Sequence, residues 1–562
     1  MQKKQTILVV ASLLVVVLSV TLAYFTAQII GKGKNVTINS ADLKIIFTDS
    51  DGSISGTNIE PGKWNDAKTF TIENKSNETY KYNIVIQDLV NTFVTNGYLQ
   101  YKITSTNDGY NMTEFKDVPK SETATDTILA YSASIDVGVT QSYTVEFKYS
   151  NDESVEQSED MGKTLSGKLF ITEGTIDPAV YYAGYEEGTL GYQIMGDNPT
   201  RGTRDTYDAV FTNNTTGTLF TATEKNVHNI ADTTVYYYAG NTTNNWVKFG
   251  KYQNDFIRYR GYYSSTNTTD YIEYSTMDEC TSASKYNTNC TEYKYANAGD
   301  DIYWRIIRTN ADGSIKLLYA GTSPDTTEGY IGKSVFNTTR NSPKYVGYMY
   351  GENDDTLVNA RTNTNNSTIK AAIDNWYASN MTSYTKYLST TAVYCNDRTE
   401  KKAGTYNKGG TFYYAPYARA KTNYTPTYNC TNMSDAFSVN NTSAKLTYPT
   451  SLMTSDEIMY AGGKSGAKLT SPYAWYYLNS ANGSITDYNL WWLLSPDDWR
   501  LDGAFAFLVY GSYIPGNLLH SSVDSSLAVR PAISLKSCTL YNAGDGTAET
   551  PYTVKLDPDI SC

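Results

Sequence analysis

Short runs of alternating polar and apolar residues fill the first third of the chain, from residue 35 to about 175. Residues 43–47, 80–86 and 142–147 show the pattern most clearly. A period of two places successive side chains on opposite faces, so each run predicts a half-buried β-strand, and the Gly, Asn, Asp and Ser clusters between runs predict turns. Six or more such strands predict a β-sandwich or jelly-roll-like domain over 35–175. The other runs are 68–72, 98–103 and 167–171.

An uncharged apolar segment, Ile7 to Phe25, precedes this domain and follows Lys3 and Lys4. A basic start and an apolar core are typical of a signal peptide, and the length is close to the ~20 residues that span a bilayer. Residues 1–25 therefore form a hydrophobic helix that is either a cleaved signal or a retained membrane anchor. Thr21 and Ala23 offer small residues before a cleavage point, which we place after Ala23. Either alternative puts the rest of the chain outside the cell.

Four motifs in this part of the chain resemble the TasA/camelysin-like family of Gram-positive bacteria. They are Leu22-Ala23-Tyr24-Phe25-Thr26, Leu43-Lys44-Ile45, Ile59-Glu60-Pro61-Gly62 and Phe70-Thr71-Ile72-Glu73-Asn74. The resemblance implies cleavage by a dedicated signal peptidase, a jelly-roll-like sandwich and, for some members, self-assembly into biofilm matrix fibres. The metalloprotease activity linked to camelysin is not carried over, because the chain has no HExxH motif.

Residues 176–234 are polar and irregular, and they predict a linker. From residue 235 to 562 the pattern predicts an α+β domain. Residues 302–308 and 315–319 flank Asp312-Gly313, which predicts a β-hairpin. Ser367 to Met381 has helical spacing of apolar residues with Ser367 as N-cap, and Thr454 to Glu457 forms a capping box that starts a second helix.

Two motifs near the end of the chain resemble a domain of unknown function found in surface proteins of Firmicutes. They are Trp491-Trp492-Leu493-Leu494-Ser495-Pro496 and Ala528-Val529-Arg530-Pro531-Ala532-Ile533, close to the usual WWLRSP and GVRPA. The resemblance implies a fold like that of C-type lectins. Leu494 stands where the pattern has Arg, which puts any role of that side chain in doubt.

The six cysteines all lie in the distal part of the chain. An even number in an exported protein favours disulfides over metal ligands. Sequential pairing is the arrangement that we favour among the alternatives, and we expect no metal site. The candidates are Cys280, Cys290, Cys395, Cys430, Cys538 and Cys562.

Composition supports the same picture. The chain has 562 residues, 52 of them Tyr, and Tyr favours strands, so we expect a mostly β protein. Its net charge of −12 repels phosphate backbones, so nucleic-acid binding is not expected.

The residues most suited to hold a ligand follow the second family motif. Trp491 or Trp492 could stack on a sugar ring, but only one of them, because adjacent strand residues point to opposite faces, and the core is the more common place for such a pair. Asp497 and Asp498, with Asp502, offer oxygen ligands for calcium or form a plain acidic loop, and no other cofactor is expected. Arg530 could contact a ligand or form an internal ion pair.

Catalytic motifs are not found in the sequence. His228 and His520 are the only histidines, and neither has a nucleophile partner by motif. We therefore expect a non-enzymatic protein of the Gram-positive cell surface or extracellular matrix, which binds a glycan or surface protein through its lectin-like module. The alternatives are a secreted polysaccharide hydrolase, which would use paired carboxylates, and a purely structural matrix-fibre subunit.

Overall fold

The computed structural model describes residues 36–39, 43–47, 52–56, 59–95, 97–174, 181–274, 276–501, 503–511 and 513–556. The hydrophobic segment 7–25, the proposed cleavage point at Ala23, Asp502 and Cys562 lie outside the described residues. The chain divides into two compact units, residues 1–184 and residues 185–562. Among the described residues, no helix is both long enough and apolar enough to cross a membrane.

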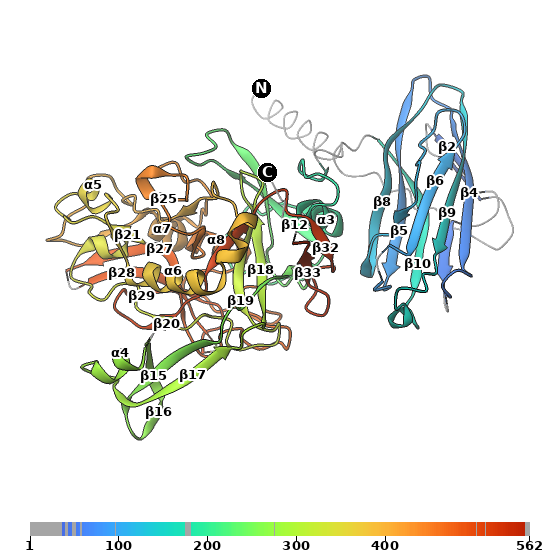
Figure 1. Cartoon of the computed structure of the whole chain (residues 1–562). Coiled ribbons are helices and arrows are strands. Elements are labelled where there is room, and N and C mark those ends of the chain that lie inside the picture. The colour runs from blue at the N-terminus through green and yellow to red at the C-terminus, as the bar shows by residue number, and fades with distance from the viewer. Residues whose placement is uncertain are drawn as a thin grey trace, which may run out of the picture. The chain divides into compact units, whose positions relative to one another are not determined.

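The first unit consists of two antiparallel sheets (Figure 1). The larger sheet has the order β1 (Val36–Asn39), β2 (Leu43–Phe47), β4 (Asn65–Asn74), β9 (Thr140–Tyr149), β6 (Leu99–Ser105) and β7 (Lys116–Asp117). The smaller sheet has the order β3 (Ser53–Gly56), β10 (Leu165–Glu173), β5 (Tyr80–Asn91) and β8 (Ser121–Ile135). A short 3-10 turn, η1 (Ser158–Asp160), precedes β10.

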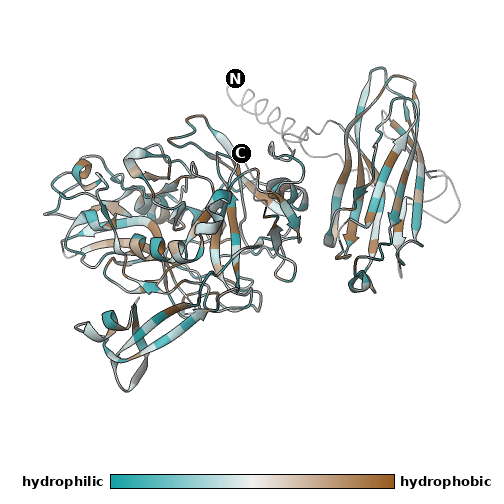
Figure 2. Ribbon diagram, viewed as in Figure 1, coloured by the Kyte–Doolittle hydropathy of each residue, from teal (hydrophilic) through white to brown (hydrophobic). Residues whose placement is uncertain are grey.

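Both sheets of the first unit bury their apolar positions in one core. In β9, for example, Tyr143, Val145 and Phe147 are buried while the residues between them are not. Ile84 of β5 and Leu169 of β10 bring the smaller sheet into the same cluster. The alternation of teal and brown along the strands in Figure 2 shows the same period of two. All six strands predicted from the alternating runs are confirmed.

The second unit is built on two larger sheets and three small ones. The largest contains β11 (Thr200–Gly202), β12 (Thr218–Glu224), β13 (Thr233–Tyr237), β18 (Asp301–Thr309), β14 (Trp246–Lys251), β33 (Tyr552–Val554), β32 (Tyr541–Ala543), β19 (Ile315–Gly321), β31 (Ala532–Leu535) and β26 (Thr450–Ser451). The next contains β20 (Lys333–Ser334), β30 (Leu527–Ala528), β27 (Trp491–Arg500), β28 (Gly503–Val509), β29 (Leu518–Ser522) and β24 (Phe412–Tyr413). The small sheets pair β21 (Met349–Tyr350) with β22 (Asn365–Asn366), pair β23 (Tyr394–Cys395) with β25 (Ala436–Phe437), and join β16 (Asn267–Tyr274), β15 (Phe256–Ser264) and β17 (Thr288–Ala296).

Most of these pairings are antiparallel, so the expectation of a mostly β protein is confirmed. The predicted hairpin is present as β18 and β19. The three-stranded sheet of β15, β16 and β17 extends away from the remainder of the second unit (Figure 1).

Both predicted helices of the second unit are present. The longer is α6 (Thr368–Asn380), in which the Ser367 side chain accepts a hydrogen bond from the Lys370 amide. The other is α8 (Ser455–Ala461), which has the predicted capping box between Thr454 and Glu457. The sequence predicted about two helices, which is too few, because short helices with little apolar periodicity also form. These are α3 (Leu190–Asp197), α4 (Met277–Ser282), α5 (Leu357–Ala360) and α7 (Ala415–Ala418), with the 3-10 turns η2 (Pro343–Val346), η3 (Thr382–Tyr387) and η5 (Thr442–Ala444) and the π-helix η4 (Arg419–Asn423).

Residues 185–234, where an irregular linker was expected, belong to the second unit and carry α3, β11 and β12. The polar composition of this segment does not predict these elements, because several of its polar side chains are buried and hydrogen-bonded rather than solvated. Asn198, for instance, donates to the carbonyl of Ile194 and to the hydroxyl of Tyr238. The start and the end of this unit also meet, since the Leu190 amide donates to the Thr539 carbonyl at 2.8 Å.

Two disulfides close loops of the second unit, Cys280–Cys290 and Cys395–Cys430. Both follow the sequential pairing predicted from the sequence. Cys538 is also disulfide-bonded, and Cys562, its expected partner, lies outside the described residues.

Candidate ligand-binding site

Strand β27 carries four of the five residues predicted to hold a ligand, and every residue of it from Trp491 to Trp499 is buried. The Trp492 indole donates to the Ser334 carbonyl at 3.0 Å and packs edge-on against Phe336. Both Trp491 and Trp492 are enclosed by protein and present no ring face to solvent. The exposed groove that a stacked sugar needs is therefore not formed by these two rings.

Arg530 lies beside Trp491 inside the second unit, with its guanidinium 4.7 Å from the indole ring. It donates to the carbonyls of Tyr319 and Tyr476 at 3.1 and 3.0 Å. Burial lowers the pKa of Arg530 to about 9, and its Nη2 has no hydrogen-bond partner among the described residues. These contacts connect the segment of Arg530 with the segments of Tyr319 and Tyr476 in the core. Arg530 is therefore not accessible to an external ligand.

Asp497 and Asp498 are also buried, but the cationic side chains that contact them are partly exposed. A register shift between Pro496 and Asp498 makes this part of β27 a bulge, which re-aims neighbouring side chains. The Lys421 ammonium lies 2.8 Å from both carboxylate oxygens of Asp497. Arg500 donates from Nε and Nη2 to Asp498 at 2.9 and 2.8 Å, and its side chain is 42% exposed.

His520 of β29 connects the two halves of this cluster. Its Nδ1 lies 2.9 Å from Asp497, and its Nε2 lies 3.1 Å from Arg500 Nη2. Nε2 accepts from Arg500, because a guanidinium only donates, and Nδ1 lies 2.7 Å from the Lys421 ammonium as well as beside Asp497. Burial and the neighbouring Asp497 raise the pKa of the Asp498 carboxyl. The cluster is thus a charge-balanced network with one edge in solvent.

Calcium does not fit this donor set. The ion takes six to eight oxygen ligands, whereas Asp497 and Asp498 are already bound by cationic side chains. Within the described part of the chain, no group of three or more His, Cys, Asp or Glu side chains is arranged to hold a metal ion.

A small polar pocket is lined in part by Arg419 of η4. Its water-accessible volume is about 20 Å³, which is room for one water molecule. The disulfide Cys395–Cys430 forms part of its wall, and Ser495 of β27 forms another part. The charged side chains around it are Arg308, Lys316, Asp397, Arg419, Asp456 and Glu457.

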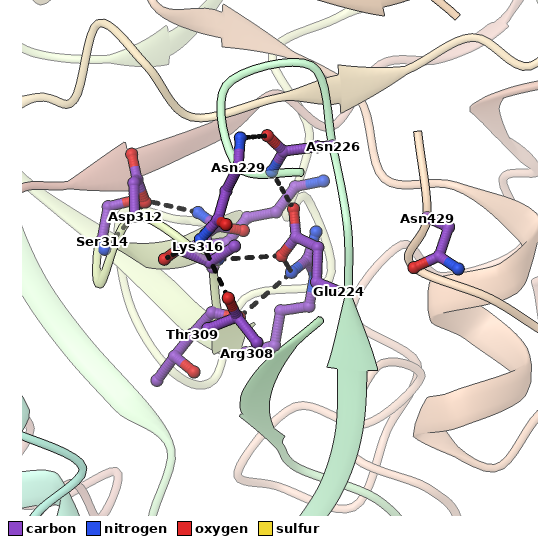
Figure 3. Close-up of polar contacts among 12 residues, drawn as sticks. Glu224, Asn226, Asn229, Arg308, Thr309, Asp312, Ser314, Lys316 and Asn429 are labelled. Carbon is purple, nitrogen blue, oxygen red and sulfur yellow. Dashed lines mark hydrogen bonds and ion pairs between the residues drawn. The ribbon is translucent and has the colours of Figure 1, made fainter. Parts of the chain in front are cut away.

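Each arginine of this pocket bridges two carboxylates. Arg308 contacts Glu224 at 2.5 Å and Glu457 at 3.1 Å, and Figure 3 shows the Glu224 side chain turned toward Arg308 with Lys316 beside them. Arg419 contacts Asp397 at 2.8 Å and Asp456 at 2.6 Å. Every charge therefore has a fixed partner, and the pocket is preorganised.

The pKa values of two of these carboxyls reflect their partners. Burial alone would raise the pKa of Asp397, but Arg419 and the Thr399 hydrogen bonds hold it below its usual range. Burial likewise opposes ionisation of Glu457, and Lys316 with Arg308 keeps its pKa low. Both groups remain ionised and strongly bound, which makes them poor proton carriers.

Sequence reasoning did not identify the residues of this pocket as a site. One signal was present, because Arg305, Arg308 and Lys316 interrupt the apolar runs of β18 and β19. A cation inside a buried strand requires a carboxylate or carbonyl partner. The partners Glu224 and Glu457 come from distant segments, so the pattern could not name them.

No protein-family model matches the chain, and no curated protein is significantly similar to it.

Proposed function

We propose that this chain is an exported protein of a Gram-positive cell surface or extracellular matrix that acts by binding rather than by catalysis. The observation that carries the proposal is the pair of disulfides in the second unit. Disulfides form and persist outside the reducing cytosol, which agrees with the basic and apolar start of the chain. The second unit would hold a glycan or a surface protein.

The two sheets of the first unit, which share one core, support a sandwich of the TasA/camelysin-like type in an anchoring or assembly role. The mixture of sheets, short helices and disulfides in the second unit supports a lectin-like module. The ion pairs of the pocket favour binding over catalysis, because the carboxylates that acid–base chemistry would use are held by Arg308 and Arg419.

The first experiment locates the protein. Cells that produce the full chain are fractionated, and intact cells are treated with protease. We expect the chain in the medium or the matrix, or digested on whole cells, with peptides joined through Cys280–Cys290 and Cys395–Cys430 in non-reducing mass mapping. A protein that stays protected inside the cell with free thiols would refute the proposal.

The second experiment tests binding with the secreted chain. Cells and matrix are coated on a surface, either untreated, oxidised with periodate or digested with protease. Binding that is lost after periodate identifies a glycan, and binding that is lost after protease identifies a protein. Filaments in electron micrographs without any binding would identify a purely structural subunit instead.

A further inference from the structure

We propose that Tyr488 and Tyr513 form an exposed stacking surface for the pyranose rings of an uncharged glycan. This inference rests on the proposed binding function and assigns the ligand class and the place on the second unit. Tyr513 is 84% exposed, and Tyr488 is 61% exposed. Their ring centroids lie 5.7 Å apart with an angle of 56° between the planes, so the rings do not cover one another.

Tyr488 and Tyr513 thus leave most of their side-chain surface in contact with solvent. The phenol hydroxyls of Tyr488 and Tyr513 also make no hydrogen bond to any residue that the structure describes. A pyranose ring has an apolar face of C–H groups and a rim of hydroxyls. A tyrosine with a free ring face and a free hydroxyl offers a partner for each.

Backbone contacts are made on either side of the two tyrosines. Gly511 lies against the backbone of Tyr488, where an added Cβ would come within 2.6 Å of the Tyr488 carbonyl carbon. Asn489 donates to the hydroxyl of Tyr330 at 3.1 Å and fixes one loop. The amide of Asn517 donates to the carbonyl of Ile514 and fixes the other.

Two further tyrosines precede Tyr488 in the sequence, of which Tyr473 is partly exposed and Tyr477 is buried. The rings of Tyr473 and Tyr477 lie 5.0 Å apart. Burial raises the pKa of Tyr477, with smaller contributions from Tyr473 and from Asp487, the residue before Tyr488. Asp487 is exposed, and its carboxylate can accept hydrogen bonds from sugar hydroxyls.

The small area of the two rings and the acidic charge of the chain favour an uncharged small ligand over a protein or an anion. Two tyrosine rings cover far less than the ~800 Å² that each partner contributes to a standard protein–protein interface. An anionic ligand would meet Asp487 and the acidic net charge of −12. An uncharged saccharide fits both limits.

The test uses the full secreted chain on an array of uncharged pyranose oligosaccharides. The variants are Tyr488→Ala, Tyr513→Ala and the double substitution. Tyr263→Ala is the matched control, because Tyr263 is also 61% exposed and lies 5.4 Å from a partner ring, Tyr286, on the three-stranded sheet. We expect each single variant to weaken binding, the double variant to weaken it by about tenfold or more, and the control to bind like the parent.

The outcomes separate this inference from the proposed function. Glycan binding that survives the double substitution, or that is lost in Tyr263→Ala instead, overturns the assignment but leaves a glycan-binding protein. No binding to any uncharged glycan by the parent chain overturns the inference as well. Binding to protease-sensitive surfaces would then still support the proposed function. Equal unfolding midpoints for all variants establish that a loss of binding is local.

Discussion

The carboxylate of Glu457 and the ammonium of Lys316 lie 2.6 Å apart inside the second unit, and neither side chain is more than 2% exposed. Such a pair gains little over two apolar side chains, but removing one partner leaves a buried charge without compensation. Glu457 also pairs with Arg308 and accepts from the Thr454 amide. One side chain thus satisfies two cations and the start of α8.

Substitution Glu457→Gln is expected to destabilise the second unit by about 3–5 kcal/mol, because Lys316 and Arg308 lose their shared carboxylate. Lys316→Met should cost less, since Arg308 still neutralises Glu457. The measurement is urea unfolding followed by tryptophan fluorescence, which reports mainly on the second unit because only Trp64 lies in the first. Lys294→Gln breaks the exposed pair with Asp255 and should leave the midpoint unchanged. A midpoint for Glu457→Gln equal to that of Lys316→Met would contradict this ranking.

Substitution Arg530→Lys is expected to destabilise the second unit by about 1–3 kcal/mol. A lysine ammonium cannot reproduce the fork that donates to Tyr319 and Tyr476, so buried carbonyls lose their donors. Arg530→Met should be better tolerated than Arg530→Lys, because it removes the uncompensated buried charge. Thermal unfolding of the three proteins side by side measures the order, and a Lys variant as stable as the parent would exclude this role.

The stability of the second unit should contain a pH-dependent contribution from Asp197. Burial, with a smaller contribution from Asp545, raises the pKa of this half-buried carboxyl to about 7. The folded state then holds a proton that the unfolded state has lost, so this contribution is present at pH 4 and is lost as pH rises toward 7. Asp197→Asn should therefore gain stability relative to the parent at pH 8 and show no such gain at pH 4. Urea midpoints at the two pH values measure it.

A second variant checks the assignment to Asp197. The Tyr552 hydroxyl donates to its carboxylate at 2.9 Å and stabilises the ionised form. Tyr552→Phe removes this donor, so the pKa of Asp197 should rise and the loss of stability should move to higher pH. A pH profile that does not differ between Tyr552→Phe and the parent would assign the dependence to another group.

Removal of Cys395–Cys430 should destabilise the second unit more than removal of Cys280–Cys290. The two bridges close loops with sequence separations of 35 and 10 residues. Chain entropy predicts losses of about 4 and about 3 kcal/mol respectively. Paired Cys→Ser variants, unfolded by heat without reductant, give the order. Reversal of this order would show that packing around the bridges outweighs loop length.

The alternating runs located six of the ten strands that the structure describes in the first unit, because burial alternates along strands such as β4 and β9. In β9, Tyr143 and Val145 are buried on either side of a partly exposed Thr144. Local signals were equally informative in the second unit. The Thr454 capping box and the Cys395–Cys430 pair are both present.

The candidate site was less accessible to this reasoning. Trp491 and Trp492 lie on a strand that is buried on both faces, where alternation carries no information about exposure. Asp497 is adjacent in sequence to Asp498, but its partners Lys421 and His520 are contributed by other segments. Tyr488 and Tyr513 are two among 52 tyrosines, and only the folded chain distinguishes those that are exposed.

The contact between the two ends of the second unit has a mechanical consequence. Thr189 forms a bridge with Leu540, and β33 pairs with β14. Segments near the start and near the end of the second unit therefore lie together beside the largest sheet. A tensile force applied at Tyr185, for example by flowing liquid, would separate α3 from β32 before it acts on β18 or β27. The interior of the sheets would bear tension only after that lateral contact fails. The same closeness makes the unit a good candidate for circular permutation, with new termini in an exposed loop far from the join.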